Sequence, residues 1–417
     1  MNQSPPIRPL HLSPSRTIVT SFNSQHSCTS TSCVHSTTPA DVTEAYFDDG
    51  DWVVCIHSTA SFVGCALSSG ELQFYDPRNL QLKQALRNFH GDGIITDLVG
   101  APPQQYSDHL VASSGTDGNV CVVDLRQPAS PSSGPCVSCS MPNQSNNNEE
   151  ALSVSLGYDG NLAAVGTSKA KIHFYDLRQP HQPVGSYVNS HTDDVTRVRF
   201  QNFPQHHNVS TTTGLLLTGS EEGLACIFDT TQPSEEAALK YVMNTQTSLR
   251  QVGFFGPNLE NIYCLTGSET LSLWSLDTAQ CLADYSDIRS TLEADYLVNA
   301  SWDHFSEKLS LLSGTSSGEL LLSTIGANGN VHGNNGQRPP IMTSHRLAGG
   351  HKGVVRDWCP TSSNLLITVG EDARMCEWDL TKGQTSDGSL VKSPSTAIVN
   401  RKFSRRRQKN KRSAAPY

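Results

Sequence analysis

Short alternating runs of apolar and polar residues, separated by turns that usually contain glycine, recur along most of the chain. Each unit starts with small polar residues, passes through a turn, and ends in an apolar strand pattern, which Asp follows in most copies. It reads SSGELQFYD (68–76), SSGTDGNVCVVD (113–124), GTSKAKIHFYD (166–176), TGSEEGLACIFD (218–229), TGSETLSLWS (266–275), SGTSSGELLLS (313–323) and TVGEDARMCEWD (368–379). Apolar patterns on both sides of a short turn predict a β-hairpin in each copy.

The spacing of these seven copies predicts the architecture. Successive copies end 46 to 56 residues apart, which is enough for about four short strands and a loop. Polar stretches at residues 127–150, 202–213 and 326–340 account for the extra length, and we expect them to be mobile loops. A four-stranded sheet cannot bury both faces alone, whereas seven sheets stacked around an axis cover one another. Because no helix pattern of useful length appears, the sequence predicts an all-β, seven-bladed β-propeller.

The two ends of the chain differ from this pattern. Residues 1–40 are rich in Ser, Thr and Pro, and residues 383–417 form a basic tail; both compositions predict disorder. The propeller domain is therefore expected over residues 41–382. Its last blade needs an outer strand, and residues 17–22, 42–47 and 396–403 are three candidates among which the sequence does not choose.

A histidine precedes several copies, in FHGDGIITDL (89–98), SHTDDVTRVRF (190–200) and GGHKGVVRDW (349–358). With the seven turns and the closing WD pair, these residues resemble the WD-repeat family over roughly residues 50 to 380. The resemblance implies a hydrogen-bonded set of His, Ser or Thr, Asp and Trp in each blade. The last copy matches this set in full, with His351, Thr368, Asp372 and Trp378.

The other copies match this set only in part. Val123 stands where the second copy should have Trp, Glu222 stands where the fourth should have Asp, and Lys169 stands there in the third. We therefore expect most blades to be held together by apolar packing, with fewer buried polar networks. These His and Asp residues are expected to be structural rather than catalytic.

Enzyme and metal motifs are missing from the sequence. It has no G-x-S-x-G, no phosphate-binding P-loop and no H-E-x-x-H, so we expect no catalytic residues, no cofactor and no enzyme activity. Cys136 and Cys139 form C-V-S-C, but zinc would need a second ligand pair, so we expect no metal site. The sequence shows neither a secretory signal nor an apolar run long enough to span a membrane, so we expect reduced cysteines and no membrane partner.

Charge is distributed unevenly along the chain. The net charge of −9 includes eight cations within the last 17 residues, so the remainder carries −17. This tail fits a nuclear or nucleolar address, a weak nucleic-acid contact or a solubilising end. The acidic remainder argues against a broad nucleic-acid face. The tail cations are Arg401, Lys402, Arg405, Arg406, Arg407, Lys409, Lys411 and Arg412.

An Asp-x-Arg sequence follows the strand pattern in the first three copies. In the third copy, Tyr175, Asp176 and Arg178 resemble the short box of WD-repeat proteins that act as substrate receptors of cullin–RING ubiquitin ligases. That resemblance implies that Arg178 contacts the ligase adaptor. The alternative is that Asp and Arg merely fix the turn after the strand.

These features favour a monomeric, non-enzymatic scaffold that binds other proteins on the faces of the propeller. Two alternatives stay open. One is a substrate receptor of a cullin–RING ubiquitin ligase, and the other is a nuclear or nucleolar assembly factor whose basic tail associates with RNA. The expected location is the nucleus, the cytoplasm, or both.

Overall fold

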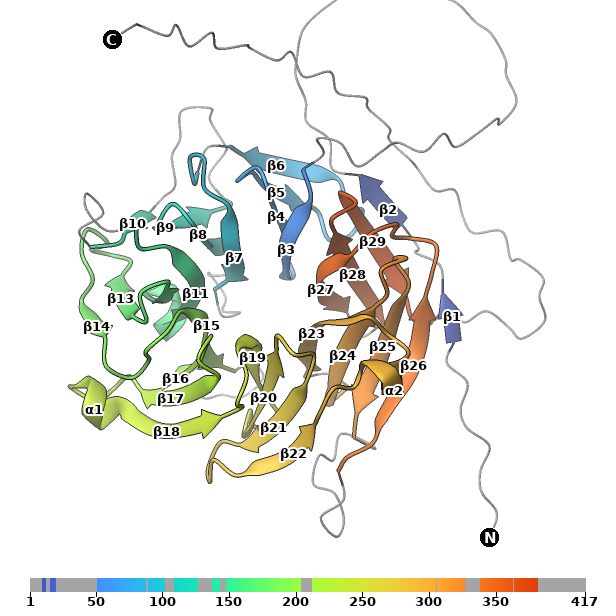
Figure 1. Cartoon of the computed structure of the whole chain (residues 1–417). Coiled ribbons are helices and arrows are strands. Elements are labelled where there is room, and N and C mark those ends of the chain that lie inside the picture. The colour runs from blue at the N-terminus through green and yellow to red at the C-terminus, as the bar shows by residue number, and fades with distance from the viewer. Residues whose placement is uncertain are drawn as a thin grey trace, which may run out of the picture.

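The computed structural model describes residues 10–12, 16–19, 51–87, 89–101, 109–126, 137–142, 148–203, 212–304, 306–326, 338–362 and 364–381. These residues form seven antiparallel sheets arranged as blades around a central channel (Figure 1). The structure confirms the predicted all-β, seven-bladed propeller. The basic tail lies outside the described residues.

In every blade, four strands run from the channel outward in chain order. The last blade differs only in its outer strand, which comes from the N-terminal segment. Blades 1 to 3 comprise β3 (Val53–Ser58), β4 (Val63–Leu67), β5 (Leu72–Tyr75), β6 (Leu82–Leu86); β7 (Ile95–Gly100), β8 (Leu110–Gly115), β9 (Asn119–Asp124), β10 (Val137–Ser140); and β11 (Ala151–Gly157), β12 (Leu162–Thr167), β13 (Ile172–Asp176), β14 (Gly185–Tyr187). Blades 4 and 5 comprise β15 (Val195–Asn202), β16 (Thr212–Ser220), β17 (Leu224–Asp229), β18 (Leu239–Asn244); and β19 (Leu249–Phe255), β20 (Asn261–Thr266), β21 (Leu271–Ser275), β22 (Cys281–Tyr285). Blades 6 and 7 comprise β23 (Tyr296–Asp303), β24 (Lys308–Gly314), β25 (Leu320–Ile325), β26 (Ile341–Leu347); and β27 (Val355–Ser362), β28 (Leu365–Gly370), β29 (Arg374–Asp379).

The repeated sequence unit corresponds to the hairpin of the second and third strands in each blade. Three single-turn helices lie in the connections: η1 (Tyr158–Gly160), α1 (Glu235–Ala238) and α2 (Arg289–Leu292). We call the upper face the one formed by the turns between second and third strands and by the connections between blades. The lower face carries the other turns. The inner strands begin at the upper face and line the channel.

The hydrophobic core is divided among the seven contacts between neighbouring blades. Each buried apolar cluster combines residues of two adjacent blades, as the first and last blades show with Val53 and Cys65 packed against Ile367 and Met375. The other six clusters fill the remaining contacts in the same way. Both faces of each sheet are thereby covered, which explains why the strands are apolar on both sides.

Two strands from the N-terminal segment complete the outer edge of blades 6 and 7 (Figure 1). β2 (Arg16–Val19) pairs antiparallel with β29, with Thr17 opposite Cys376. β1 (Leu10–Leu12) pairs parallel with β26 as a fifth strand of blade 6. Of the three candidates for closing the last blade, residues 17–22 overlap β2. Both strands lie N-terminal to the predicted domain boundary at residue 41.

The stretch 127–150, expected to be a mobile loop, also contributes to the fold. Residues 137–140 form β10, the outer strand of blade 2, and Cys139 is fully buried against Val120 and Met141. Burial raises the pKa of the Cys139 thiol to about 12, so it is a core side chain and not a reactive one. Cys136 lies outside the described residues.

Candidate functional site

The last blade contains the complete hydrogen-bonded set that the WD-repeat resemblance implies. His351 lies just before β27, and its Nδ1 and Nε2 atoms are 3.1 Å from Asp372 Oδ1 and 2.8 Å from Thr368 Oγ1. Trp378 Nε1 donates to the same Thr368 oxygen at 2.8 Å. Asp372 also accepts the backbone N–H of Lys352 at 2.7 Å. The set therefore joins the connection before the blade to its second and third strands.

Ionisation strengthens this set. Burial alone would lower the pKa of His351, but its contacts with Asp372 and Cys376 outweigh burial and raise it to about 9. Burial likewise opposes ionisation of Asp372, and the hydrogen bond and charge of His351 hold its pKa below the usual value. The two groups thus form a buried ion pair at neutral pH, at a place with no opening for a substrate.

Blades 2 and 4 keep the His contacts without the Trp. In blade 2, His90 lies 2.9 Å from Asp117 and 2.8 Å from Ser113. In blade 4, His191 lies 2.8 Å from both Glu222 and Thr218. The longer Glu222 side chain thus takes the place of the Asp at the same distance, which the sequence alone could not establish.

Blade 3 has a different polar network, which the sequence analysis missed. Glu149, 3% exposed, takes the place of the His and accepts a hydrogen bond from Thr167 Oγ1 at 2.7 Å. His173, from β13, and Lys171 lie 3.2 and 3.3 Å from the Glu149 carboxylate. The Lys169 residue is exposed, and only its backbone N–H is seen to join this network, by donating to Thr167 Oγ1 at 3.3 Å. The sequence feature that could have indicated this network was His173, a polar residue inside an apolar strand.

The inner strands share a second feature, a β-bulge near the upper end of the channel. We call the residue that follows each bulge the bulge residue. These are Cys55, Asp97, Ser153, Arg197, Gln251, Asn299 and Asp357. Three of them accept a backbone N–H from the next blade: Asp357 from Ile56 at 3.1 Å, Asp97 from Val154 at 3.3 Å and Ser153 from Val198 at 3.1 Å. The channel wall is therefore cross-linked from blade to blade.

Asp97 and Arg199 form an ion pair across the third blade. Arg199 Nη1 lies 2.7 Å from Asp97 Oδ2, and Ser153 Oγ donates to the same oxygen at 2.6 Å. Burial would raise the pKa of Asp97, but the charges of Arg199 and Arg197 outweigh it and lower the pKa to about 2. This pair, drawn from blades 2 and 4, fixes three consecutive blades around the channel.

The rim of the channel on the upper face divides into an apolar and a polar part. The residue three positions before each bulge residue lies on this rim. On six blades its carbonyl accepts an N–H from the turn at 2.9 to 3.1 Å, and three of these residues are apolar: Trp52, Ile94 and Val354. The same position in blade 6 is Tyr296. These four residues, from the adjacent blades 6, 7, 1 and 2, are the apolar arc.

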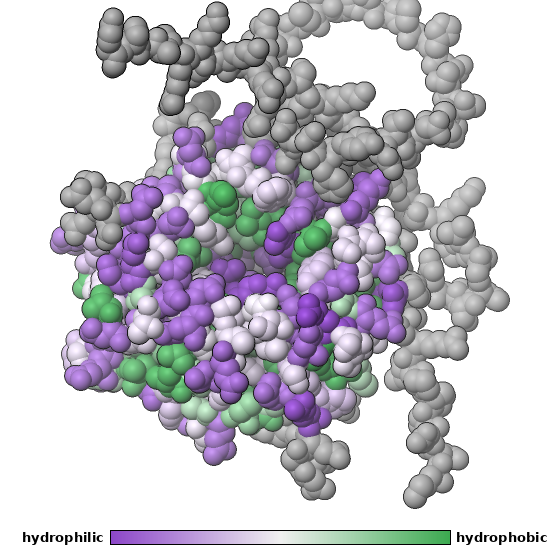
Figure 2. All heavy atoms as spheres, viewed as in Figure 1, coloured by the Kyte–Doolittle hydropathy of each residue, from purple (hydrophilic) through white to green (hydrophobic). Residues whose placement is uncertain are grey.

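The apolar arc is accessible. Trp52 is 44% exposed and Ile94 is 48% exposed, and Val354 and Tyr296 are partly exposed. Across the channel the same position holds Glu150, Asp194 and Ser248 in blades 3 to 5. Figure 2 shows hydrophobic atoms gathered over β3, β7 and β27 beside the hollow and hydrophilic atoms around the opposite side.

Comparisons with known proteins agree with this geometry. WD repeat-containing protein GTS1 of Arabidopsis thaliana is 27% identical over 362 residues, which are 81% of this chain and 85% of that protein. WD repeat-containing protein 89 homolog of Dictyostelium discoideum is 26% identical over 343 residues, 79% of this chain and 83% of that protein. No family model matches the chain. The chain is thus similar to WD-repeat proteins over about four fifths of its length, 81% and 79% in these two comparisons.

A solved structure supports the propeller fold of this chain independently of sequence. A chain in the crystal structure of the mitotic checkpoint complex superposes with a TM-score of 0.57, covering 76% of this chain and 86% of that one, at 12% identity. At that identity the likeness concerns the fold alone.

On the lower face, the propeller presents three similar Asp-x-Arg turns on blades 1 to 3. Arg178 donates from Nε and Nη2 to the two Asp176 oxygens at 2.8 and 2.6 Å and remains 73% exposed. Arg78 and Arg126 make the same fork with their own Asp. Tyr175 is fully buried, and its hydroxyl donates to the Ser140 carbonyl at 3.0 Å. Arg178 is thus accessible to a partner, whereas Tyr175 belongs to the core.

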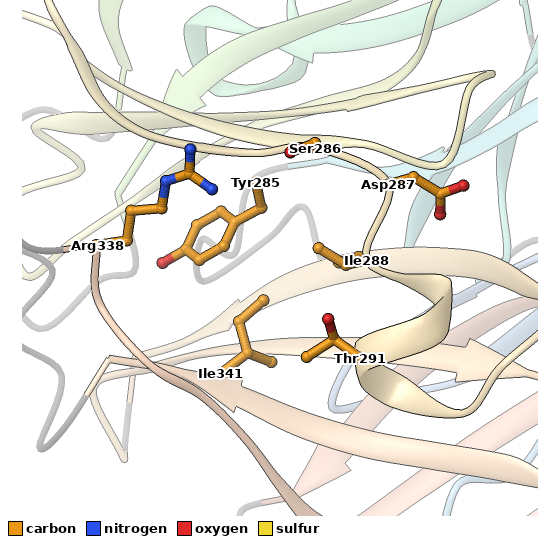
Figure 3. Close-up of a pocket in the computed structure, with 7 residues that line it drawn as sticks. All are labelled: Tyr285, Ser286, Asp287, Ile288, Thr291, Arg338 and Ile341. Carbon is orange, nitrogen blue, oxygen red and sulfur yellow. The ribbon is translucent and has the colours of Figure 1, made fainter.

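A small pocket of about 230 Å³ opens between blades 5 and 6 (Figure 3). Its sides are formed by Tyr285, Ile288, Thr291, Arg338 and Ile341, with Arg338 and the Tyr285 ring on one side of the hollow. Tyr285 donates its hydroxyl to the Pro339 carbonyl at 2.6 Å. This volume is below the range of about 300–1,000 Å³ of most small-molecule sites, so the pocket is poorly suited to a substrate.

The described residues contain no candidate metal site. Within these ranges, no three His, Cys, Asp or Glu side chains gather as metal ligands would. None of the helices in the described ranges is long and apolar enough to cross a membrane.

Proposed function

We propose that this WD-repeat protein is a non-enzymatic scaffold that binds a protein partner on the upper face of its propeller. The apolar arc is the observation that supports this proposal. Exposed Trp52 and Ile94 and partly exposed Val354 and Tyr296 occupy the same rim position on four adjacent blades beside the channel mouth. Large apolar side chains at the centre of an interface carry much of the binding energy of protein complexes.

The backbone geometry favours binding without rearrangement. Trp52 and Ile94 are fixed by paired hydrogen bonds to Ser68 and Thr116 in the adjoining turns, at 2.9 to 3.1 Å. A partner therefore meets side chains already held in position, so little conformational entropy is lost on binding. The polar side of the rim would surround such a contact and exclude water from its edge.

Quantitative affinity capture of the full-length chain from cells tests the proposal. Ile94→Glu places a charge in the apolar arc and should remove the main bound proteins, with a loss of about tenfold or more in recovery. Val242→Glu is the matched control, because Val242 is 50% exposed on the outer strand β18, away from the channel. Equal recovery of partners by the two variants would contradict the proposal.

A second candidate function has an observation of its own. The three forked Asp-x-Arg turns present Arg78, Arg126 and Arg178 from neighbouring blades on the lower face, where a ligase adaptor could contact them. If the protein is a substrate receptor of a cullin–RING ubiquitin ligase, Arg178→Ala should abolish capture of the adaptor. Arg289→Ala is the control, since Arg289 makes the same fork with Asp287 in a connection on the upper face. Retained capture by the Arg178 variant would exclude this role.

A further inference from the structure

Three arginines converge on the channel mouth from the inner strands. Arg250 and Arg356 occupy the position just before the bulge residue in blades 5 and 7, and Arg197 is the bulge residue of blade 4. Elsewhere the position of Arg250 holds Thr96 and Thr196, whose hydroxyls donate at 2.6 Å to the carbonyl of the next blade. Arg250 makes that interblade bond with its guanidinium, to the Leu297 carbonyl, and so carries a positive charge to the rim.

These guanidinium groups lie close enough to repel one another. Burial is the main cause that lowers the pKa of Arg250, and the positive charges of Arg197 and Arg356 lower it further. The Arg250 Nε atom is buried and has no hydrogen-bond partner within the described residues. A buried donor without an acceptor costs about 1–3 kcal/mol, more for a charged group. The Arg250 side chain as a whole is nevertheless 37% exposed, so part of its guanidinium remains accessible to a ligand.

Nearby carboxylates compensate these charges only in part. In the part of the chain that the structure describes, Arg197 donates to neutral oxygens, Gln251 Oε1 at 3.0 Å and the Thr196 carbonyl at 2.9 Å. Glu269 Oε2 lies 3.6 Å from Arg250 Nη2 and accepts the Leu297 N–H at 2.6 Å, so this carboxylate oxygen is already engaged by another donor. Arg356 pairs with Glu371, and both side chains remain partly exposed, so this pair can open.

We infer that the channel mouth binds a carboxylate of an acidic peptide on a protein partner, with a neighbouring apolar side chain on the apolar arc. This inference rests on the proposed function and specifies its partner. Guanidinium groups form forked, charge-assisted bonds with carboxylates. The apolar arc lies across the mouth from Arg197, and Arg250 reaches one end of it by bonding to Leu297, next to Tyr296. The acidic surface around the mouth, including Glu150, Asp194 and Glu221, opposes a long polyanion such as RNA.

A phage-displayed random dodecapeptide library, selected on the full-length protein, tests this inference. Selected peptides should contain Asp or Glu within a few residues of Leu, Phe or Trp. Replacing that acid by its amide should weaken binding by about tenfold, measured by fluorescence anisotropy. Selection of Lys- or Arg-rich peptides, or no charge preference, would overturn the inference, as would displacement of the peptide by a single-stranded RNA oligonucleotide.

Two protein variants should move the affinity in opposite directions. Arg356→Gln should weaken binding of the selected peptide by about tenfold, and Glu371→Gln should strengthen it by about threefold because it frees Arg356. Misfolding cannot strengthen binding, so the second variant separates charge from stability. Arg126→Gln, on the lower face, should change nothing. If the two variants do not shift the affinity in opposite directions, the carboxylate site is refuted.

The experiments distinguish a failure of the apolar arc from a failure of the carboxylate site. If Ile94→Glu abolishes peptide binding while the Arg356 and Glu371 variants leave it unchanged, the scaffold surface stands and the carboxylate site falls. If Ile94→Glu has no effect while those two variants act as expected, the carboxylate site stands without the apolar arc.

Discussion

The His351–Asp372 pair in the last blade is more deeply buried than the His–carboxylate pairs of blades 2 and 4. Its side chains are 0% and 5% exposed, whereas Asp117 and Glu222 in blades 2 and 4 are 17% and 14% exposed. Blade 7 also keeps Trp378, which shares the Thr368 hydroxyl with His351. Because an isolated charge costs more the deeper it is buried, the effect of removing one partner should differ between these blades.

Asp372→Asn should lower the free energy of unfolding by about 3 kcal/mol at neutral pH, because it leaves His351 buried without its carboxylate. Asp117→Asn, the matched change in blade 2, should cost about 1–2 kcal/mol. Urea denaturation of both variants measures the difference. Equal losses would mean that burial does not control the contribution.

The same variant should show a characteristic pH dependence. His351 has a pKa raised from 6.5 to about 9, so its stabilisation is fully present below pH 6.5 and is lost as the pH rises through 9. The difference in stability between the wild type and Asp372→Asn should therefore shrink between those two values. A constant difference over this range would show that His351 is not held in its charged form.

For the Asp97–Arg199 pair at the channel, stability should depend on pH in the opposite direction. The pKa of Asp97 is lowered from 3.8 to about 2, so its stabilisation is present above pH 3.8 and lost as the pH falls through 2. Asp97→Asn should cost about 3–5 kcal/mol at neutral pH because Arg199 keeps its charge. The double variant Asp97→Asn with Arg199→Met should recover part of that loss in thermal unfolding. A double variant less stable than the single one would contradict the pairing.

Among the elements, β2 closes the ring and β1 extends it. β2 covers β29, whose Met375, Cys376 and Trp378 are buried, and so it completes the blade that packs against the first one. β1 adds a parallel strand to an already four-stranded blade, so it covers less of the core.

Deleting residues 1–19 should therefore destabilise the propeller by roughly 2–6 kcal/mol from the four paired positions of β2 alone, at about 0.5–1.5 kcal/mol per hydrogen bond, and loss of β1 adds to this. Deleting residues 1–13 removes β1 alone and should have the smaller effect. Thermal unfolding of the two truncations compares them. If the shorter deletion is as damaging as the longer one, the main contribution comes from β1 and not from closure by β2.

At the level of the whole molecule, an acidic propeller is joined to a basic tail. The tail lies outside the described residues, and each apolar cluster of the described residues joins two blades to each other. Removal of the tail should therefore leave folding unchanged while it changes cellular placement or contacts with nucleic acid.

A fluorescent fusion of residues 1–400 should lose nuclear accumulation relative to the full chain, if the tail is a nuclear address. The thermal unfolding temperature of the two proteins should be the same. A full-length variant with the eight tail cations changed to Gln is the matched control for length. Unchanged nuclear accumulation in both variants would refute this role, and RNase-sensitive binding lost with the tail would instead indicate contact with RNA.

The sequence by itself determined the number of blades, because seven hairpins of similar spacing can bury their faces only by stacking around an axis. It also identified His351, Thr368, Asp372 and Trp378, since these residues follow a fixed spacing in one repeat. Lys169 and Glu222 were recognised as departures from that spacing. What replaced the missing partners could not be predicted, because Glu149 reaches its place through tertiary packing.

Only the tertiary structure decided which residues of different blades meet. The Asp97–Arg199 pair joins residues 102 positions apart, and the pairing of β2 with β29 joins the two ends of the chain. Such contacts depend on the closed ring, which brings distant segments together without any local sequence signal. The apolar arc arose in the same way, because Tyr296, Val354, Trp52 and Ile94 become neighbours only when the first and last blades meet.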